Sequence, residues 1–209
     1  MDGTFLTFLG VSVVVIVAPG PDTALAIRNT LRGGRTRGVA TALGVSTGQL
    51  IWASATSVGL VAVLLASELI FRGVRLAGAG YLIWLGLQSL RAAFSGRGQH
   101  APQVTNAERF SSRAAFAQGI LNNLGNPKMA VFFASVLPQF TAPGQGMVSA
   151  LVLLGVIFSA MTFAWLAAYA VALSTAGRLL RAPRAQRAIE AVSGAVLIGL
   201  GAKIAADAR

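Results

Sequence analysis

The hydrophobic and polar positions of this chain alternate in blocks whose length matches a membrane-crossing helix. A bilayer core about 30 Å thick needs roughly 20 helical residues for one crossing. The apolar runs predict six helices, at residues 3–27, 39–66, 74–93, 114–137, 147–174 and 188–206. Five crossings stay open as an alternative, because the third and sixth runs are free of charge only over residues 76–90 and 191–202.

One stretch decides the class of protein. Residues 129–177, which are 49 positions, contain no Asp, Glu, Lys or Arg, and this length holds two crossings with the turn between them. The composition agrees, because 55% of the 209 residues are hydrophobic and only 11% are charged, against about 25% charged in soluble domains. We therefore expect an all-α, polytopic membrane helix bundle, with residues 1–209 forming a single transmembrane domain.

The charge of the chain is strongly positive, with 17 Lys and Arg against 6 Asp and Glu. In a soluble protein this balance would suggest nucleic acid as the partner. Here the location of the charge indicates otherwise, since twelve of the 17 basic residues lie in three connectors between apolar runs. These are Arg28, Arg32, Arg35, Arg37, Arg91, Arg97, Arg109, Arg113, Arg178, Arg181, Arg184 and Arg187. The positive-inside rule places all three connectors in the cytoplasm and both termini outside, with the lipid bilayer as partner and no nucleic acid.

Several kinds of chemistry lack the residues they need. The chain has no Cys, and its one His, His100, lies in the polar stretch 95–113, which we interpret as a cytoplasmic linker. Asp22 is the one acidic residue away from the ends of the predicted spans, so clustered carboxylates for a metal and a general base for catalysis are both missing. We expect no metal, no cofactor and no enzyme. A passive channel or a structural membrane subunit stays open beside a transporter.

The first predicted span is interrupted near its middle by Pro19-Gly20-Pro21-Asp22. Proline lacks the backbone donor and clashes with the preceding turn, which costs about 3 kcal/mol or more inside a helix. The motif therefore predicts two half-helices, with Pro21 at the start of the second one.

The fourth predicted span is interrupted by Asn126-Pro127-Lys128. Asn126 suits the N-cap and Pro127 the first helical position, so a new helix N-terminus is predicted there. Lys128 follows Asp22 by 106 positions, about half the chain. The two breaks therefore predict two three-helix repeats, residues 3–94 and 114–209, which enter the membrane from opposite sides because three is an odd number.

The charged residues at the breaks are the candidate site. A charge at a helix centre costs roughly 2.5 to 3.5 kcal/mol on insertion scales, so Asp22 and Lys128 are expected to face each other or a cavity. One interpretation is an ion pair that joins the two halves. The other is a receptor for a zwitterion such as a free amino acid, with Lys128 and the half-helix ends binding a carboxylate and Asp22 binding an ammonium.

Asp22 has a second possible role. A carboxyl group that alternates between a wet and a drier environment can carry a proton, so Asp22 either couples export to proton entry or only binds substrate. Neighbouring residues complete the predicted site: the substrate-binding set is Asp22, Lys128, Asn126, Asn123, Gly20 and Phe132, with Phe132 as a wall. Three further amides, Gln49, Asn122 and Gln139, could complete the cavity, but bonding between helices is the role expected of them.

Taken together, these residues resemble the LysE/RhtB family of amino-acid exporters. The resemblance is carried by Pro19-Gly20-Pro21-Asp22, Gly38, Ala42-Leu43-Gly44-Val45, Gly48, Gly80-Tyr81-Leu82-Ile83-Trp84-Leu85-Gly86, Gly119, Asn123, Asn126-Pro127-Lys128, Phe132-Phe133 and Leu137-Pro138-Gln139-Phe140. The combination of both breaks is specific, although its parts are not, and the specific positions lie before residue 140.

The resemblance implies a bacterial inner-membrane protein that exports amino acids or close analogues by proton antiport, without a cofactor. It implies that the functional core is Pro19, Gly20, Pro21, Asp22, Asn126, Pro127 and Lys128. Nothing in these motifs selects one amino acid, and the sequence leaves assembly into a homo-oligomer open.

Overall fold

The computed structural model describes residues 3–66, 111–141 and 146–180 continuously, together with separate positions between 73 and 94 and between 191 and 206. Its elements are α1 (Gly3–Val17), α2 (Pro21–Ala66), α4 (Ser112–Leu124), α5 (Pro127–Val131), the π-helix η1 (Phe132–Val136), the 3-10 helix η2 (Leu137–Phe140) and α6 (Met147–Leu180). The described residues contain helices and no strand. The predicted all-α class is thus confirmed for this part of the chain.

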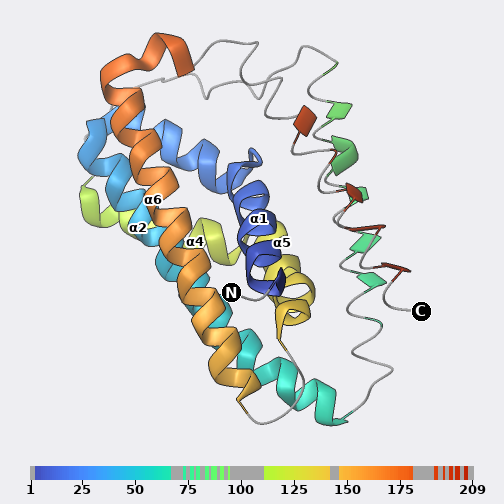
Figure 1. Ribbon diagram of the computed structural model, residues 1–209. Coiled ribbons are helices and arrows are strands. Elements are labelled where there is room, and N and C mark those ends of the chain that lie inside the picture. Colours follow the sequence, from blue (N-terminus) through green and yellow to red (C-terminus); the bar gives the residue numbers. More distant parts are fainter. Residues whose placement is uncertain are drawn as a thin grey trace.

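The long helix α2 is the centre of the bundle. It packs against α6 on one side and against α4 on another, while α1 and α5 lie beside each other (Figure 1). The core between α1, α5, η1 and α6 contains four fully buried aromatic rings, those of Phe8, Phe132, Phe133 and Phe158. These contacts bring the two predicted breaks to the same level of the bundle.

The first break is confirmed. Helix α1 ends at Val17, residues 19 and 20 are not helical, and α2 begins at Pro21. The two helices are bent by 52° relative to each other. The missing donors of the two prolines account for the interruption.

The connector that was predicted after this first span differs from the expectation. Residues 28–38 were expected to be a connector, but α2 is helical there and turns at Gly34, whose φ of 73° and ψ of −176° are not helical. The side chain of Asn29 donates to Thr41 Oγ1 at 2.9 Å, whereas twelve residues of straight helix span about 18 Å. The two parts of α2 therefore fold back on each other, and glycine permits the positive φ that this reversal needs.

The second break is also confirmed. Helix α4 ends at Leu124, and Asn126 caps the next helix by accepting a hydrogen bond at Oδ1 from the Lys128 backbone N–H at 3.0 Å, with Pro127 in the first turn. The helical path continues to Phe140 rather than to residue 137, first as a π-helix and then as a 3-10 helix. Pro138 explains the change of winding, because it has no N–H for the carbonyl one turn earlier.

Helices α2 and α4 approach each other at backbone distance. A methyl group at Gly44 would meet the carbonyl oxygen of Phe116, and one at Gly119 would meet that of Thr41. Only glycine allows such an approach. This close packing places the end of α4 next to the start of α2.

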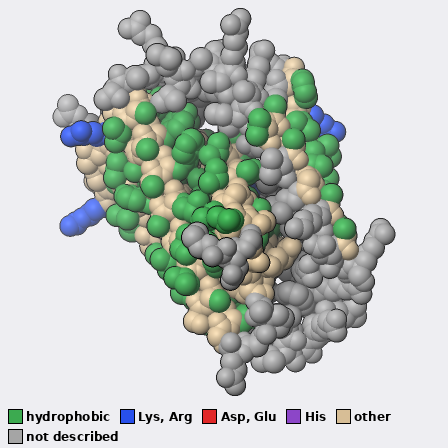
Figure 2. Space-filling model, viewed as in Figure 1, with side chains coloured by type: hydrophobic (Ala, Val, Ile, Leu, Met, Phe, Trp, Pro, Cys, Tyr) green, Lys and Arg blue, Asp and Glu red, His purple; other side chains and the backbone are tan. Residues whose placement is uncertain are grey.

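The surface of the described part is suited to lipid. Residues Met147–Ser174 of α6, which coincide with the predicted span 147–174, are long and apolar enough to cross a membrane. The bent pair Thr4–Val17 and Pro21–Gly59 has a suitable length and composition as well. Exposed side chains include Leu6, Leu121 and Leu153. Figure 2 shows hydrophobic side chains over most of the described face and the few basic ones at its margins.

The remaining predicted segments lie largely outside the described residues. These are the spans 74–93 and 188–206 and most of the linker 95–113, whose last residues form the start of α4, with Ser111 as its N-cap. The described positions of both spans are helical. A methyl group at Gly201 would lie 2.7 Å from the carbonyl oxygen of Ala79 and 2.7 Å from Ile83 Cγ1, so the two spans are neighbours.

Candidate functional site

Asp22 lies in the first turn of α2 and is surrounded by three amide donors. Asn122 Nδ2 donates to Asp22 Oδ1 at 2.7 Å, and Asn123 and Asn126 donate to Oδ2 at 2.8 and 2.9 Å. The Asp22 side chain is only 8% exposed. Hydrogen bonds to a charged group contribute about 1.5–3 kcal/mol each, so this triad compensates the buried carboxylate and attaches the end of α4 to α2.

Lys128 lies in the first turn of α5 and is equally buried. Its Nζ donates to the carbonyl oxygens of Val15 and Ala18, both at 3.1 Å. The last carbonyls of a helix have no partner within the helix, and they carry the negative end of its dipole. The ammonium of Lys128 therefore caps α1 across the first break.

Asp22 and Lys128 do not form the ion pair that was one of the two sequence interpretations. Each has its own hydrogen-bond partners at the opposite break, and both side chains line one cavity. Neither charged group uses all of its hydrogen-bonding positions. A carboxylate offers about four acceptor positions and an ammonium three donors, so Asp22 keeps one position, on Oδ1, and Lys128 one N–H.

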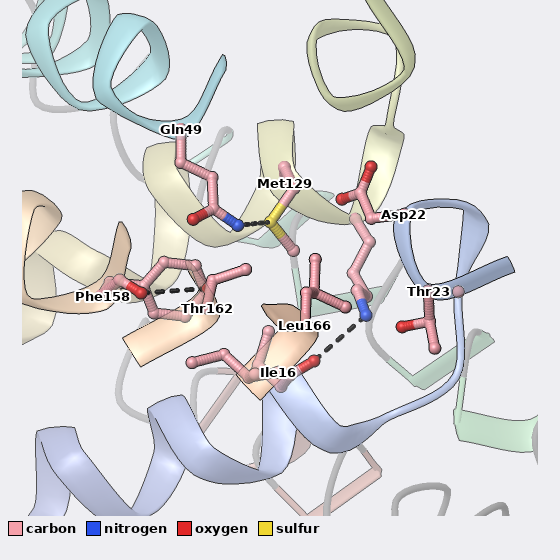
Figure 3. A pocket seen from close by; sticks show the side chains of 11 residues that line it. Ile16, Asp22, Thr23, Gln49, Met129, Phe158, Thr162 and Leu166 are labelled. Atoms are coloured by element: carbon pink, nitrogen blue, oxygen red, sulfur yellow. Dashed lines mark hydrogen bonds between the residues drawn. The ribbon is translucent and has the colours of Figure 1, made fainter. Parts of the chain in front are cut away.

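The cavity between the two charges, here called the central cavity, is shown in Figure 3. Its polar lining consists of Gly20, Asp22, Thr23, Gln49, Lys128 and Thr162. Its apolar lining consists of Val15, Ile16, Met129, Phe158 and Leu166. The volume of about 20 Å³ is enough for one water molecule and too small for an amino acid.

The predicted site residues are brought together, but in different roles. Gly20 lines the central cavity, and a methyl group at this position would lie 3.2 Å from Lys128 Nζ. Asn123 and Asn126 do not line the cavity. They donate hydrogen bonds to the carboxylate of Asp22, which does.

Phe132 does not form the wall that was expected of it. Its ring stacks on Phe158 with the ring centres 4.2 Å apart and packs edge-on to Phe133. Phe158 of α6 lines the cavity instead. The aromatic wall is therefore Phe158, and Phe132 supports it from the second layer.

Three amide side chains outside the predicted substrate-binding set differ in the contacts that they make. Asn122 bonds between helices as expected, but its acceptor is Asp22. Gln139 donates to the Ser135 carbonyl oxygen at 2.6 Å within its own helical stretch. Gln49 lines the cavity, donates only to the sulfur of Met129 at 3.6 Å, and leaves Oε1 without a partner.

Sequence reasoning missed the α6 side of the site. Phe158, Thr162 and Leu166 carry no signal in the sequence, because they follow the ordinary helical spacing of an apolar span. The amide of Gln49 within an apolar run was the one available signal.

Fold and site together define a helical membrane protein whose two interrupted helices meet at a buried pair of opposite charges. The family model described as "LysE type translocator" matches residues 13–208. The chain belongs to this family of membrane translocators.

Characterised and uncharacterised relatives cover nearly the whole chain. The homoserine/homoserine lactone efflux protein of Salmonella typhimurium is 29% identical over 96% of this chain and 95% of its own. The threonine efflux protein of Escherichia coli K12 is 27% identical over 94% and 95%. The uncharacterized membrane protein YrhP of Bacillus subtilis is 26% identical over 96% and 97%. No solved structure matches the chain significantly.

Proposed function

We propose that this protein exports a free amino acid or a close analogue from the cytoplasm across the bacterial inner membrane by proton antiport. The observation that carries the proposal is the placement of one carboxylate and one ammonium, Asp22 and Lys128, on a single buried cavity at the two helix breaks. An amino acid has the complementary pair of charges. The efflux activities in the names of two relatives support the same substrate class.

Substrate binding follows from the hydrogen-bonding positions that remain free on Lys128 and Asp22. The third N–H of Lys128 donates to the substrate carboxylate, and the remaining position on Asp22 Oδ1 accepts from the substrate ammonium. Lys128 stays fixed by the α1 carbonyls while it does so. Charge-assisted hydrogen bonds of this kind are about twice as strong as neutral ones.

Proton coupling follows from the acceptor position that remains free on Asp22 Oδ1. The three amide donors occupy one position on Oδ1 and both positions on Oδ2, so a proton binds at the position that would accept from the substrate ammonium. A proton there also removes the negative charge of the carboxylate. Proton and substrate therefore compete for Asp22, as antiport requires.

The topology proposed for this cycle has six spans in two inverted repeats, residues 3–94 and 114–209, with both termini outside. The breaks at 19–20 and 125–126 interrupt the helices on either side of the cavity, and they act as hinges when the cavity opens to one side or the other. The protein works as a monomer or as a homo-oligomer of such units.

The experiment feeds a panel of dipeptides to cells with and without the protein and measures which liberated amino acid appears in the medium. The identified amino acid is then loaded into proteoliposomes with and without a pH gradient. Export that requires the gradient and is lost in Asp22→Asn, but retained in the matched control Asp2→Asn, is the expected result. Equal flux through Asp22→Asn without a gradient would show a passive channel instead.

A further inference from the structure

The carbonyl oxygen of Gln49 is a polar atom that the fold leaves unused inside the central cavity. The Gln49 side chain is 1% exposed, and its Oε1 has no hydrogen-bond partner. Its amide nitrogen faces the Met129 sulfur at 3.6 Å. Since sulfur is only a weak acceptor, this contact orients the amide without satisfying it.

The oxygen is turned toward the α6 side of the cavity. Figure 3 shows Gln49 Oε1 on the side of Phe158 and Thr162, away from Asp22. The Thr162 hydroxyl donates to the Phe158 carbonyl oxygen at 3.0 Å, so its oxygen also retains acceptor positions. Two uncharged acceptors therefore line the cavity together with Asp22 and Lys128.

We infer that Gln49 recognises the side chain of the substrate. Its Oε1 accepts a hydrogen bond from an uncharged donor, such as a hydroxyl group, on the amino acid that Asp22 and Lys128 bind. This inference rests on the proposed export of amino acids. The geometry supplies the ends of the substrate with charged partners and its side chain with an acceptor. Met129, Phe158 and Leu166 limit the space around that acceptor.

The physical reason for selectivity is the cost of an unpaired buried acceptor. A substrate with a donor satisfies Oε1, whereas an isosteric substrate with a methyl group leaves it buried and unpaired. Sites that hydrogen-bond a substrate hydroxyl reject the analogue lacking it more strongly than apolar pockets reject an extra methylene. A preference of about tenfold for the hydroxyl compound is expected from one such bond.

The test uses proteoliposomes of the full chain loaded with equal amounts of two isosteric amino acids, threonine with valine or serine with 2-aminobutyrate. The export ratio of each pair is measured within one sample, so it does not depend on the amount of folded protein. The wild type is expected to favour the hydroxyl compound about tenfold. Gln49→Met, which keeps the length and removes the acceptor, is expected to lower the ratio to about twofold or less. Should Gln49→Met fail to insert, Gln49→Ala replaces it in the same measurement.

Gln139→Met is the matched control, because Gln139 bonds within its own helical stretch and does not line the cavity. It is expected to keep the wild-type ratio. Equal export of both compounds by the wild type, or an unchanged ratio in Gln49→Met, overturns the role of Gln49 while amino-acid export stands. Export of none of the four compounds, in a protein that the feeding screen also finds inactive, overturns the proposed function and this inference with it.

Discussion

Asn123 donates to the carboxylate of Asp22 at 2.8 Å, although 101 positions separate the two residues in the chain. The bond connects the last turn of α4 with the first turn of α2, so it joins one helix break to the other. Gly48 of α2 allows this contact, because a methyl group there would lie 2.9 Å from Asn123 Oδ1. The charged site therefore depends on a long-range neutral partner as much as on the charges themselves.

Replacing Asn123 with alanine is expected to weaken both stability and transport. The substitution removes one of three donors from a buried carboxylate, and the free energy of unfolding should fall by about 1.5–3 kcal/mol. Thermal unfolding in detergent and export from proteoliposomes measure the two effects. Ser149→Ala, at an exposed position of α6, should change neither; equal stability of Asn123→Ala and wild type would show that the triad does not hold Asp22.

Gly20→Ala is expected to impair transport with little loss of stability. The added methyl group lies 3.2 Å from Lys128 Nζ, so the ammonium must shift away from the cavity by a few tenths of an ångström. Gly10→Ala is the matched control, because nothing lies within 4 Å of a methyl group there. The two variants are compared by their export rates at equal amounts of inserted protein. Equal rates would contradict the position of the Lys128 ammonium beside Gly20.

Gly34→Ala is expected to destabilise the reversal within α2. Alanine at a φ of 73° and a ψ of −176° costs about 1–3 kcal/mol relative to glycine. Gly59→Ala, where the space is open and φ is helical, should be neutral or slightly stabilising, because alanine is the better helix former. A Gly34→Ala protein as stable as Gly59→Ala would mean that α2 does not turn at this residue.

Gly119→Ala is expected to separate α4 from α2. The methyl group would be driven against the Thr41 carbonyl oxygen and the Val45 backbone nitrogen, and overpacking of this kind costs about 1–3 kcal/mol. Export should fall as well, since Asn122 and Asn123 move with α4. Gly199→Ala, which has open space, is the control, and an unchanged melting temperature of Gly119→Ala would argue against backbone contact of the two helices.

The sequence predicts those parts of the fold that depend on local chemistry. Proline and glycine at residues 19–21 and the N-cap signal at Asn126 act within one helical turn, and both breaks are where this chemistry puts them. The apolar run 147–174 is likewise helical, and its length and composition suit a crossing. The reversal at Gly34 was missed because a pair of glycines in a basic segment also suits an ordinary connector.

The partners within the site depend on contacts between distant segments, which no local pattern encodes. An ion pair of Asp22 with Lys128 was one of the two interpretations, but α4 and α1 supply their partners. Phe158 replaced Phe132 as the wall because the crossing of α6 decides which ring faces the cavity. Residue types at the breaks thus predicted which side chains meet there, while packing determined their geometry.

The most direct measurement of the central claim is the binding of chemically trimmed substrates to purified protein by calorimetry. The exported amino acid is compared with its methyl ester, which lacks the carboxylate, and its N-acetyl derivative, which lacks the ammonium. If Lys128 and Asp22 bind opposite ends of the substrate, the wild type binds only the intact amino acid, Lys128→Met no longer distinguishes it from the ester, and Asp22→Asn no longer distinguishes it from the N-acetyl compound. Wild-type protein that binds all three compounds equally would contradict the account.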